Sequence, residues 1–342
     1  MNTPKLHAVV TTIHPPTASV RALCCALRSL NASVLIVGDR KGPSEYPLAG
    51  SELLTLERQL TLPLRLPQLL PLNHYVRKNI GYLTLISRGA ECLYEADDDN
   101  CLKGKWRPRR QRVKARAIHH PKWFNVFRHF SDERIWPRGF PLTEIAASNQ
   151  RKMRIQAPWA SVDSPIQQGL VDLHPDVDAI WRLVMGKPFH FHDADSVALM
   201  PRVWCPFNSQ NTWWFPAAYP LLYLPSHCTF RMTDILRSFV AQRCLWALDG
   251  VVTFHSADVI QRRNLHILLQ DFQDEVPGYL ANERICHTLE DLKLERGREA
   301  TGENLIRCYQ ALVAQGVFPK KELPLVRAWL KDLDAIARGL AL

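Results

Sequence analysis

The sequence predicts an α/β fold, in which a Rossmann-type mixed sheet is flanked by helices and followed by a mainly helical C-terminal extension. Three observations lead to this class: a strand–helix–strand pattern near the N-terminus, a second helix–strand pair before residue 100, and long helical patterns in the last eighty residues. With 342 residues, 46% hydrophobic and 22% charged, the composition is typical of a folded protein and excludes a disordered or fibrous chain.

The first elements follow one another closely. Residues 7–13 form a short β-branched run, and Pro15 and Pro16 end it. Residues 17–30 carry an apolar stripe at helical spacing, and residues 33–37 form a second apolar run closed by Gly38. A strand, a helix and a strand in this order predict parallel strands joined by a right-handed crossover. After a proline-rich link, residues 73–88 predict a helix and residues 92–96 a further strand.

The remainder of the chain changes character several times. Residues 101–131 contain no acid and form the most basic part of the sequence, whereas residues 136–225 are rich in Trp and Pro and show no clear period. Residues 233–248 predict a helix, which a turn joins to a strand at 251–255. Residues 265–269 and 304–340 again have helical patterns.

Charge and cysteine content narrow the functional class. The formal net charge of +10 indicates an anionic partner, such as nucleotide phosphates, nucleic acid or a membrane surface. The nine cysteines include no C-x-x-C pair, which favours free thiols in a reducing compartment. We see neither a secretory signal nor a stretch able to span a bilayer, so we expect a soluble, cytoplasmic protein that could touch a membrane through its basic stretch.

The candidate for chemistry is an acidic triplet directly after the strand at 92–96. Asp97, Asp98 and Asp99 cannot all be buried without a partner for their charge. Alternate residues project to one side, so Asp97 and Asp99 could face one ion, and oxygen ligands suit Mg²⁺ or Mn²⁺. The alternative is a solvated acidic turn. Because ligands of open α/β sheets bind beyond the carboxyl ends of the strands, the triplet lies where a site is expected.

Six segments of the sequence together resemble a known family: residues 75–83, 87–90, 94–100, 136–142, 176–183 and 230–243. Taken together, they are similar to the core of the STELLO-type glycosyltransferases, and more distantly to the reversibly glycosylated polypeptides, which are UDP-arabinopyranose mutases. This resemblance implies a GT-A-like domain over residues 1–264 with a nucleotide-sugar-binding half (1–100) and an acceptor half (101–264). Residues 265–342 would form the helical extension.

The resemblance also implies roles for residues near the triplet. Asp97 and Asp99 would hold a divalent cation, Mn²⁺ or Mg²⁺, and Asp97 and Asp98 would face the donor. Other residues predicted to contact the donor follow a strand, lie on the helix before the triplet, or fall in a basic segment near residue 262: His14, Asp39, Arg77, Lys78, Asn79 and Arg263. A solvated helix face is an alternative for Arg77 and Lys78. His255 would be a further metal ligand, and a structural role is its alternative.

The acceptor half supplies the remaining candidates. Asp234 is the first candidate for a general base, with Asp176 and Asp178 as competitors; an N-terminal helix carboxylate is the alternative for Asp234. Arg109, Arg110 and Arg231 are predicted to contact an anionic glycan or glycolipid acceptor.

We therefore expect a metal-dependent hexosyl- or pentosyltransferase that uses a nucleotide-sugar donor, a UDP-sugar. A sugar-nucleotide mutase or a nucleotidyltransferase would need the same metal site. A third reading is a non-enzymatic basic protein that binds nucleic acid or a membrane surface through the interleaved Arg and Trp residues after residue 102. Because no nucleic-acid-binding module is recognisable there, we expect no nucleic-acid partner.

Overall fold

The computed structural model describes residues 5–150, 157–262 and 267–340. Its strands are β1 (Leu6–Thr11), β2 (Ser33–Val37), β3 (Ser51–Leu54), β4 (Cys92–Ala96), β5 (Asn100–Leu102), β6 (Arg112–Ile118), β7 (Trp159–Asp163), β8 (Ile166–Asp172), β9 (Val197–Leu199), β10 (Asn211–Trp214) and β11 (Val252–Gln261). They form one sheet in the order β3-β2-β1-β4-β10-β8-β11-β9-β6-β7, and β5 pairs with β11.

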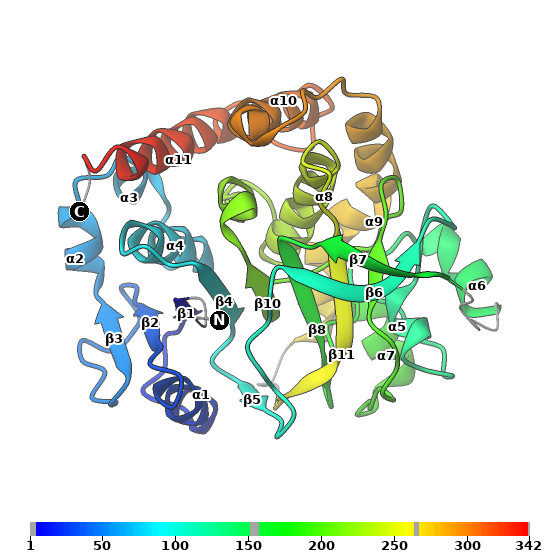
Figure 1. The fold of residues 1–342 in the computed structure, drawn as a ribbon, viewed down its shortest axis with the longest axis horizontal. Coiled ribbons are helices and arrows are strands. Elements are labelled where there is room, and N and C mark those ends of the chain that lie inside the picture. The colour runs from blue at the N-terminus through cyan, green and yellow to red at the C-terminus, as the bar shows by residue number, and fades with distance from the viewer. Residues whose placement is uncertain (1–4, 151–156, 263–266, 341–342) are drawn as a thin grey trace.

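Helices cover this sheet and extend along one edge of the molecule (Figure 1). The α-helices are α1 (Ala18–Arg28), α2 (Leu56–Thr61), α3 (Leu66–Leu69), α4 (Lys78–Ser87), α5 (Val126–His129), α6 (Leu142–Gln150), α7 (Ala179–Met185), α8 (Thr233–Trp246), α9 (Leu268–Glu290), α10 (Thr301–Ala314) and α11 (Glu322–Ala337). Short 3-10 turns are η1 (Tyr75–Arg77), η2 (Pro216–Leu222), η3 (Phe230–Met232) and η4 (Arg298–Ala300).

The N-terminal strand–helix–strand unit forms as the sequence predicts. Thr17 caps α1 by accepting a hydrogen bond from the Val20 backbone N–H, and the apolar stripe of α1 is buried. Strand β1 is parallel to both β2 and β4. The carboxyl ends of β1, β2 and β4 therefore meet at one edge of the sheet, and the acidic triplet directly follows β4 there.

The sheet changes direction after β4. Strand β10 is antiparallel to both β4 and β8, whereas β11 is parallel to β8. One mixed sheet thus runs through both of the halves expected on either side of residue 100. The pairing of β11 with β8 shifts in register between His255 and Val259, and β11 continues to Gln261. The strand predicted at 251–255 is therefore much longer than its apolar pattern indicated.

The Trp- and Pro-rich region forms much of the interior. Trp204, Trp213 and Trp214 are completely buried, and Trp213 and Trp214 belong to strand β10. Strands β8, β9 and β10 of this region are buried along their whole length, so they lack the alternation of apolar and polar residues that marks a half-buried strand in a sequence.

The C-terminal helices pack on the sheet domain. Trp329 on α11 donates to the Pro220 carbonyl at 2.9 Å, and the Asp332 carboxylate accepts from the Leu66 backbone N–H at 2.8 Å. In Figure 1, α10 and α11 lie along the edge that also contains α3 and α4. The predicted fold class, a mixed α/β sheet flanked by helices with a helical C-terminal part, is confirmed.

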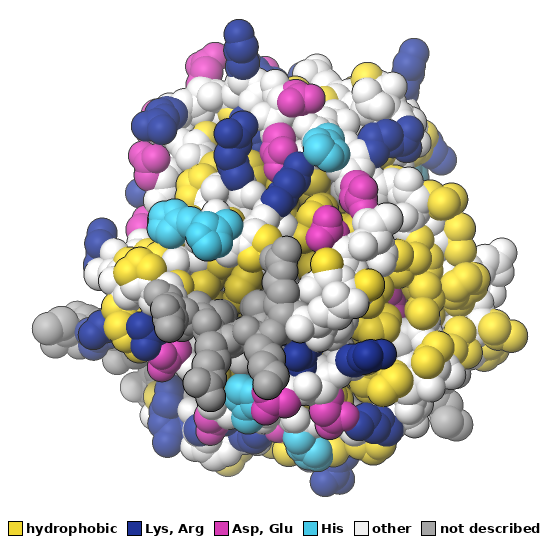
Figure 2. All heavy atoms as spheres, turned by 90° about the vertical axis from the view of Figure 1, so that its right-hand side faces the viewer, with side chains coloured by type: hydrophobic (Ala, Val, Ile, Leu, Met, Phe, Trp, Pro, Cys, Tyr) yellow, Lys and Arg dark blue, Asp and Glu magenta, His cyan; other side chains and the backbone are white. Residues whose placement is uncertain are grey.

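The surface is mixed in character. Figure 2 shows charged side chains of both signs over much of one face and a group of apolar side chains at its right-hand edge. Within the described residues, no helix is both long enough and apolar enough to cross a lipid bilayer.

Candidate functional site

A pocket of about 500 Å³ opens at the edge of the sheet where β1, β2 and β4 end. We call it the carboxyl-edge pocket. One side of it is formed by residues of the N-terminal half, including His14, Asp39 and the acidic triplet. The other side is formed by residues that follow in the chain, and these include Arg138, Asp176, Asn208, Ser209, Arg231 and Asp234.

All three carboxylates of the triplet line this pocket, but each has a different setting. The Asp97 side chain is 41% exposed. Asp98 accepts a hydrogen bond from the Thr12 hydroxyl, which ties it to the residue after β1. Asp99 accepts one from the Gln261 amide at 2.9 Å, at the end of β11. The triplet therefore forms a turn whose carboxylates line a cavity. The choice between an ion site and a solvated acidic turn stays a prediction.

Lys78 lies beneath the triplet. Its ammonium group is 3.3 Å from an Asp97 carboxylate oxygen and donates to the Ala96 carbonyl at 3.2 Å, while its side chain is only 1% exposed. Although the Asp97 side chain is partly exposed in the pocket, the protein around it displaces water from the carboxylate, and this desolvation raises its pKa to about 7 despite the opposing Lys78 charge. The Asp99 and Asp98 carboxylates raise the pKa of Asp97 further. Negative charge is thus crowded at this edge of the pocket.

The triplet matches a hard divalent cation in ligand type, because all of its donor atoms are oxygens. The triplet by itself supplies few of the ligands that such a cation needs. Across residues 5–150, 157–262 and 267–340 no three His, Cys, Asp or Glu side chains are arranged as a metal cluster. Asp97 and Asp99 would therefore need oxygens from water or from a bound phosphate to complete a coordination shell, as is usual for Mg²⁺.

The other predicted donor residues divide into two groups. His14 and Asp39 line the pocket, and Asp39 accepts backbone N–H bonds from Arg40 at 2.7 Å and His74 at 3.0 Å. Arg77 is completely buried elsewhere and donates to Gln59 at 2.7 Å, and Asn79 bonds to the Leu224 backbone. The structure does not bring these last two to the pocket, because neighbouring positions on a helix point in different directions. Arg263 lies outside the described residues.

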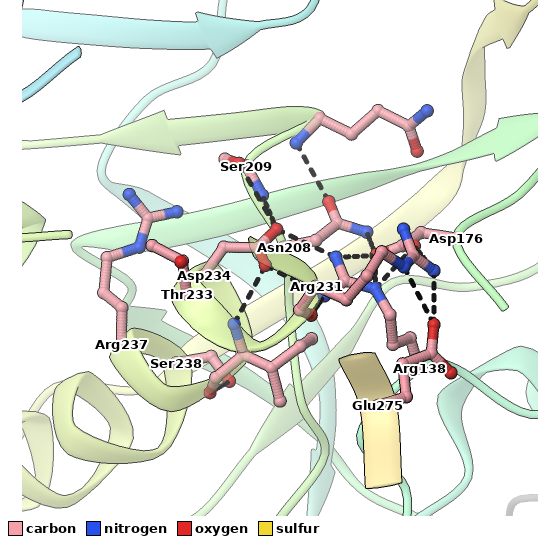
Figure 3. A network of polar contacts seen from close by, with 12 residues as sticks. Arg138, Asp176, Asn208, Ser209, Arg231, Thr233, Asp234, Arg237, Ser238 and Glu275 are labelled. Carbon is pink, nitrogen blue, oxygen red and sulfur yellow. Dashed lines mark hydrogen bonds and ion pairs between the residues drawn. The ribbon is translucent and has the colours of Figure 1, made fainter. Parts of the chain in front are cut away.

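The far side of the pocket is a network of ion pairs (Figure 3). The Arg138 guanidinium bonds to Asp176 at 2.7 Å and to both Asp234 carboxylate oxygens at 3.0 Å. Burial alone would lower the pKa of Arg138, but these two carboxylates raise this pKa well above its ordinary value. Asp176 also accepts from the Asn208 amide at 2.9 Å. Arg138 therefore holds two buried carboxylates in place.

Asp234 has little freedom to act as a base. One of its oxygens accepts from Arg138 and the Ile235 N–H, and the other from Arg138 and from the N–H and hydroxyl of Ser209. Asp176 is also engaged in ion pairs. Burial alone would raise the pKa of Asp176, but the Arg138 and Arg231 charges hold this pKa well below its usual range. This geometry does not favour either carboxylate as a proton acceptor.

Asp178, the third candidate, has a structural role in this geometry. It caps α7 by accepting from the Trp181 N–H at 2.8 Å, and it accepts from the Trp136 indole at 2.7 Å. Its side chain is completely buried, and it does not belong to the set of described residues that line the pocket.

Arg231 is the predicted acceptor residue that reaches the pocket. Its guanidinium pairs with Glu275 at 2.6 Å and lies 3.7 Å from Asp176. Beside it, the half-exposed ring of Phe230 meets Tyr75 edge-on, with ring centroids 4.6 Å apart. Arg138 and Phe230 lie in segments that we quoted as similar to a known family, yet nothing in their local sequence marked them as lining a pocket.

Arg109, Arg110 and His255 lie elsewhere. They line a separate cavity of about 410 Å³, which we call the cationic cavity, together with Lys105, Arg107, Pro108, Arg112, Val113, Lys114, Gln167, Ser196 and Asp258. His255 bonds to the Ser196 hydroxyl at 2.7 Å and to the Gln167 amide oxygen at 3.0 Å. The structure does not bring His255 to the aspartates, because β11 continues for six residues beyond it and only its end reaches the triplet.

Comparison with known proteins confirms the resemblance read from the sequence. A sequence model described as "STELLO glycosyltransferases" matches residues 231–340. The chain is 27% identical over 352 residues to the Arabidopsis thaliana protein named "Probable glycosyltransferase STELLO1", and 27% identical over 346 residues to its counterpart STELLO2. These alignments cover 96% and 95% of this chain and 44% of each plant protein, so the chain spans less than half of their length. The match up to residue 340 includes the C-terminal helices, beyond the segments that we had quoted.

Two solved structures have a distant likeness to the fold. The first is the glucosyl-3-phosphoglycerate synthase of M. tuberculosis, with a TM-score of 0.39 and 11% identity over 82% of this chain and 80% of that chain. The second is a mycobacterial protein with a TM-score of 0.41 and 7% identity, covering 83% of this chain and 74% of that chain.

Proposed function

We propose that this chain, which resembles the STELLO glycosyltransferases, transfers a hexosyl or pentosyl group from a nucleotide-sugar donor, a UDP-sugar, to a glycan or glycolipid acceptor. The observation that carries the proposal is the carboxyl-edge pocket. His14, Asp39 and the acidic triplet come from three separate segments and line one cavity. This cavity lies where nucleotides bind in open α/β sheets.

The charge of the pocket supports dependence on a divalent cation. The residues that line it include six carboxylates but only four Lys and Arg side chains. A nucleoside diphosphate would be repelled by this surface unless a cation accompanied it. Asp97 and Asp99 would hold Mg²⁺ or Mn²⁺, which supplies stabilisation of the negative charge that develops on the leaving diphosphate.

The chain's own side chains would position the donor. Asp39 is fixed by the backbone N–H groups of Arg40 and His74, so its carboxylate is placed to accept hydrogen bonds from the nucleoside. The Thr12 hydroxyl orients Asp98. Lys78 holds Asp97 from below, which keeps that carboxylate at the pocket edge before any ligand binds.

The acceptor would enter from the side of the arginines. Phe230 offers an apolar ring face to the C–H groups of a sugar, and Arg231 lies beside it. We assign Asp234 and Asp176 the role of holding Arg138 and Ser209 in position, since their oxygens are engaged in ion pairs and hydrogen bonds. A mutase or nucleotidyltransferase would share the donor side. The extension of the pocket to a second polar cluster favours a transferase, which must bind a second substrate.

Thermal unfolding with UDP and Mn²⁺ tests this proposal. A metal-dependent transferase is expected to be stabilised strongly only when both are present, by about 2.7 kcal/mol when the ligand is at a hundred times its dissociation constant. Incubation of the protein with a UDP-sugar alone and analysis of the sugar nucleotide separates the mutase, which would convert it without an acceptor. Stabilisation by UDP that is indifferent to Mn²⁺, or no stabilisation at all, would contradict the proposal.

A further inference from the structure

The cationic cavity is lined by an excess of basic side chains, which have no role in the proposed glycosyl transfer. Its lining contains a single carboxylate, Asp258, against six basic side chains: Lys105, Arg107, Arg109, Arg110, Arg112 and Lys114. Among the described residues it shares no lining residue with the carboxyl-edge pocket. Like charges gathered around one concave surface repel one another and concentrate the field there, so the cavity attracts anions.

The local fold explains how these side chains come together. Arg112 and Lys114 are alternate residues of β6, so both project from the same face of that strand, and both are exposed. The remaining cations come from the acid-free segment just before β6. Strand β11, which lies in the same sheet with only β9 between it and β6, adds His255 and Asp258 to the lining.

Only part of the positive charge is neutralised. Arg109 pairs with Asp258 at 2.6 Å, and Lys105 pairs with Asp193. Within the described chain, Arg112 and Lys114 have no carboxylate partner, and the Lys114 ammonium lies 5.2 Å from the centre of the Trp159 ring. Ring contact leaves the ammonium N–H donors available to a ligand.

The wall of the cavity is built before any ligand arrives. Gln167 donates through its amide nitrogen to the Arg110 carbonyl at 2.7 Å, which fixes the basic segment. Its amide oxygen then faces His255, so the imidazole donates to it from Nε2 and accepts at Nδ1 from Ser196. Arg109 is held against Asp258, which in turn accepts from the Asn211 amide at 2.7 Å. A prearranged site loses little free energy in ordering its side chains when a ligand binds.

We propose that the cationic cavity binds a small ligand with two or more phosphate groups. Its volume of about 410 Å³ is within the range of small-molecule sites. Guanidinium groups bind phosphate through paired N–H bonds, and phosphate carries more charge than a carboxylate. The phosphates can belong to a soluble oligophosphate or to a phosphorylated lipid headgroup. The proposal goes beyond glycosyl transfer, and it stands whether or not the carboxyl-edge pocket binds UDP.

Titration calorimetry with inorganic tripolyphosphate, in buffer with a chelator and without divalent cations, tests the site. The wild-type protein is expected to bind, with an affinity that falls as salt is added. The double variant Arg112→Glu and Lys114→Glu is expected to bind at least about tenfold more weakly. The matched control reverses two adjacent exposed lysines elsewhere, Lys320→Glu and Lys321→Glu, and should bind as the wild type does.

Two further measurements complete the test. Binding of Mn²⁺ and UDP should be the same in both double variants, which keeps the outcome independent of the proposed function. Sedimentation with phosphatidylcholine vesicles, with or without phosphatidylinositol bisphosphate, identifies the source: binding to the phosphorylated vesicles that tripolyphosphate displaces indicates the lipid, and no vesicle binding indicates a soluble ligand. Equal loss of tripolyphosphate binding in both double variants, or none in either, would overturn the proposal.

Discussion

The carboxyl-edge pocket and the cationic cavity differ in how their charges are balanced. In the pocket, carboxylates outnumber basic side chains, and its buried arginines are paired with acids. In the cavity, basic side chains outnumber the carboxylate, and exposed cations of β6 have no acidic partner in the described chain. A net charge of +10 therefore says little about either region, because the chain separates its charges in space.

The largest expected effect concerns the paired arginines of the pocket. Arg138→Met should destabilise the protein by about 3–5 kcal/mol, because it leaves the buried Asp176 and Asp234 carboxylates without their cation. Urea unfolding measures the free energy. The control is Arg338→Met, which breaks an exposed pair with Asp334 and should cost about 1 kcal/mol or less. Equal losses in both variants would show that the pocket network is no stronger than a surface pair.

The next effect concerns the triplet itself. Asp99→Asn should weaken Mn²⁺-dependent UDP binding about a hundredfold or more, because a neutral amide replaces a proposed metal-binding carboxylate. The melting temperature without ligands should be unchanged, since Asp99 serves the pocket rather than the core. Titration calorimetry measures the binding, and Asp132→Asn, at an exposed position, is the control. A variant that binds as tightly as the wild type would remove Asp99 from the site.

Removal of divalent cations should weaken ligand binding in the carboxyl-edge pocket but not in the cationic cavity. With a chelator, UDP binding should fall at least about tenfold, since the acidic pocket then repels the diphosphate. Tripolyphosphate binding should persist under the same conditions, because the cationic cavity supplies its own positive charge. Both affinities can be measured by calorimetry on one protein sample. If both ligands respond alike to the chelator, the contrast between the two regions is wrong.

The smallest effect is a dependence of stability on pH. Burial, together with the Arg109 charge, lowers the pKa of His255 well below its ordinary value. The neutral, buried His255 therefore contributes fully to the free energy of unfolding above about pH 6.5. This contribution is lost as the pH falls below that value, because the unfolded chain takes up a proton that the folded chain does not. Each pKa unit corresponds to about 1.4 kcal/mol.

The variant His255→Gln isolates this contribution. Its free energy of unfolding should fall less than that of the wild type between about pH 7 and pH 5, because glutamine does not titrate. Urea unfolding at several pH values measures the difference, and the exposed His119→Gln is the matched control. A His255→Gln profile identical to that of the wild type would show that the pKa of His255 is the same in the folded and the unfolded chain.

The sequence predicted the parts of the site that depend on nearby residues. The apolar run of β4 ends directly at the triplet, and the crossover of β1, α1 and β2 places His14 and Asp39 at the same edge of the sheet. Local periodicity is sufficient for such elements, because a parallel strand–helix–strand unit has one preferred handedness.

Other parts depend on contacts between distant segments. Arg138 meets Asp176 and Asp234 across 38 and 96 residues of sequence, and nothing near Arg138 indicates these partners. His255 could not be placed from its pattern, because the apolar run ends there while the strand continues. Arg77 and Lys78 are adjacent, yet only Lys78 reaches the triplet, whereas Arg77 bonds to Gln59. An error of one residue in the predicted start of the helix would exchange these two orientations.

Strand β11 links the two regions: His255 and Asp258 line the cationic cavity, and Gln261 reaches Asp99 in the pocket. A substitution that slides this strand at its register shift would move a wall of both regions at once. Ligand measurements on such a variant would show correlated losses that imitate cooperativity between two independent sites. Variants intended to report on a single site therefore belong on β6 or in the triplet, outside the strand that both sites share.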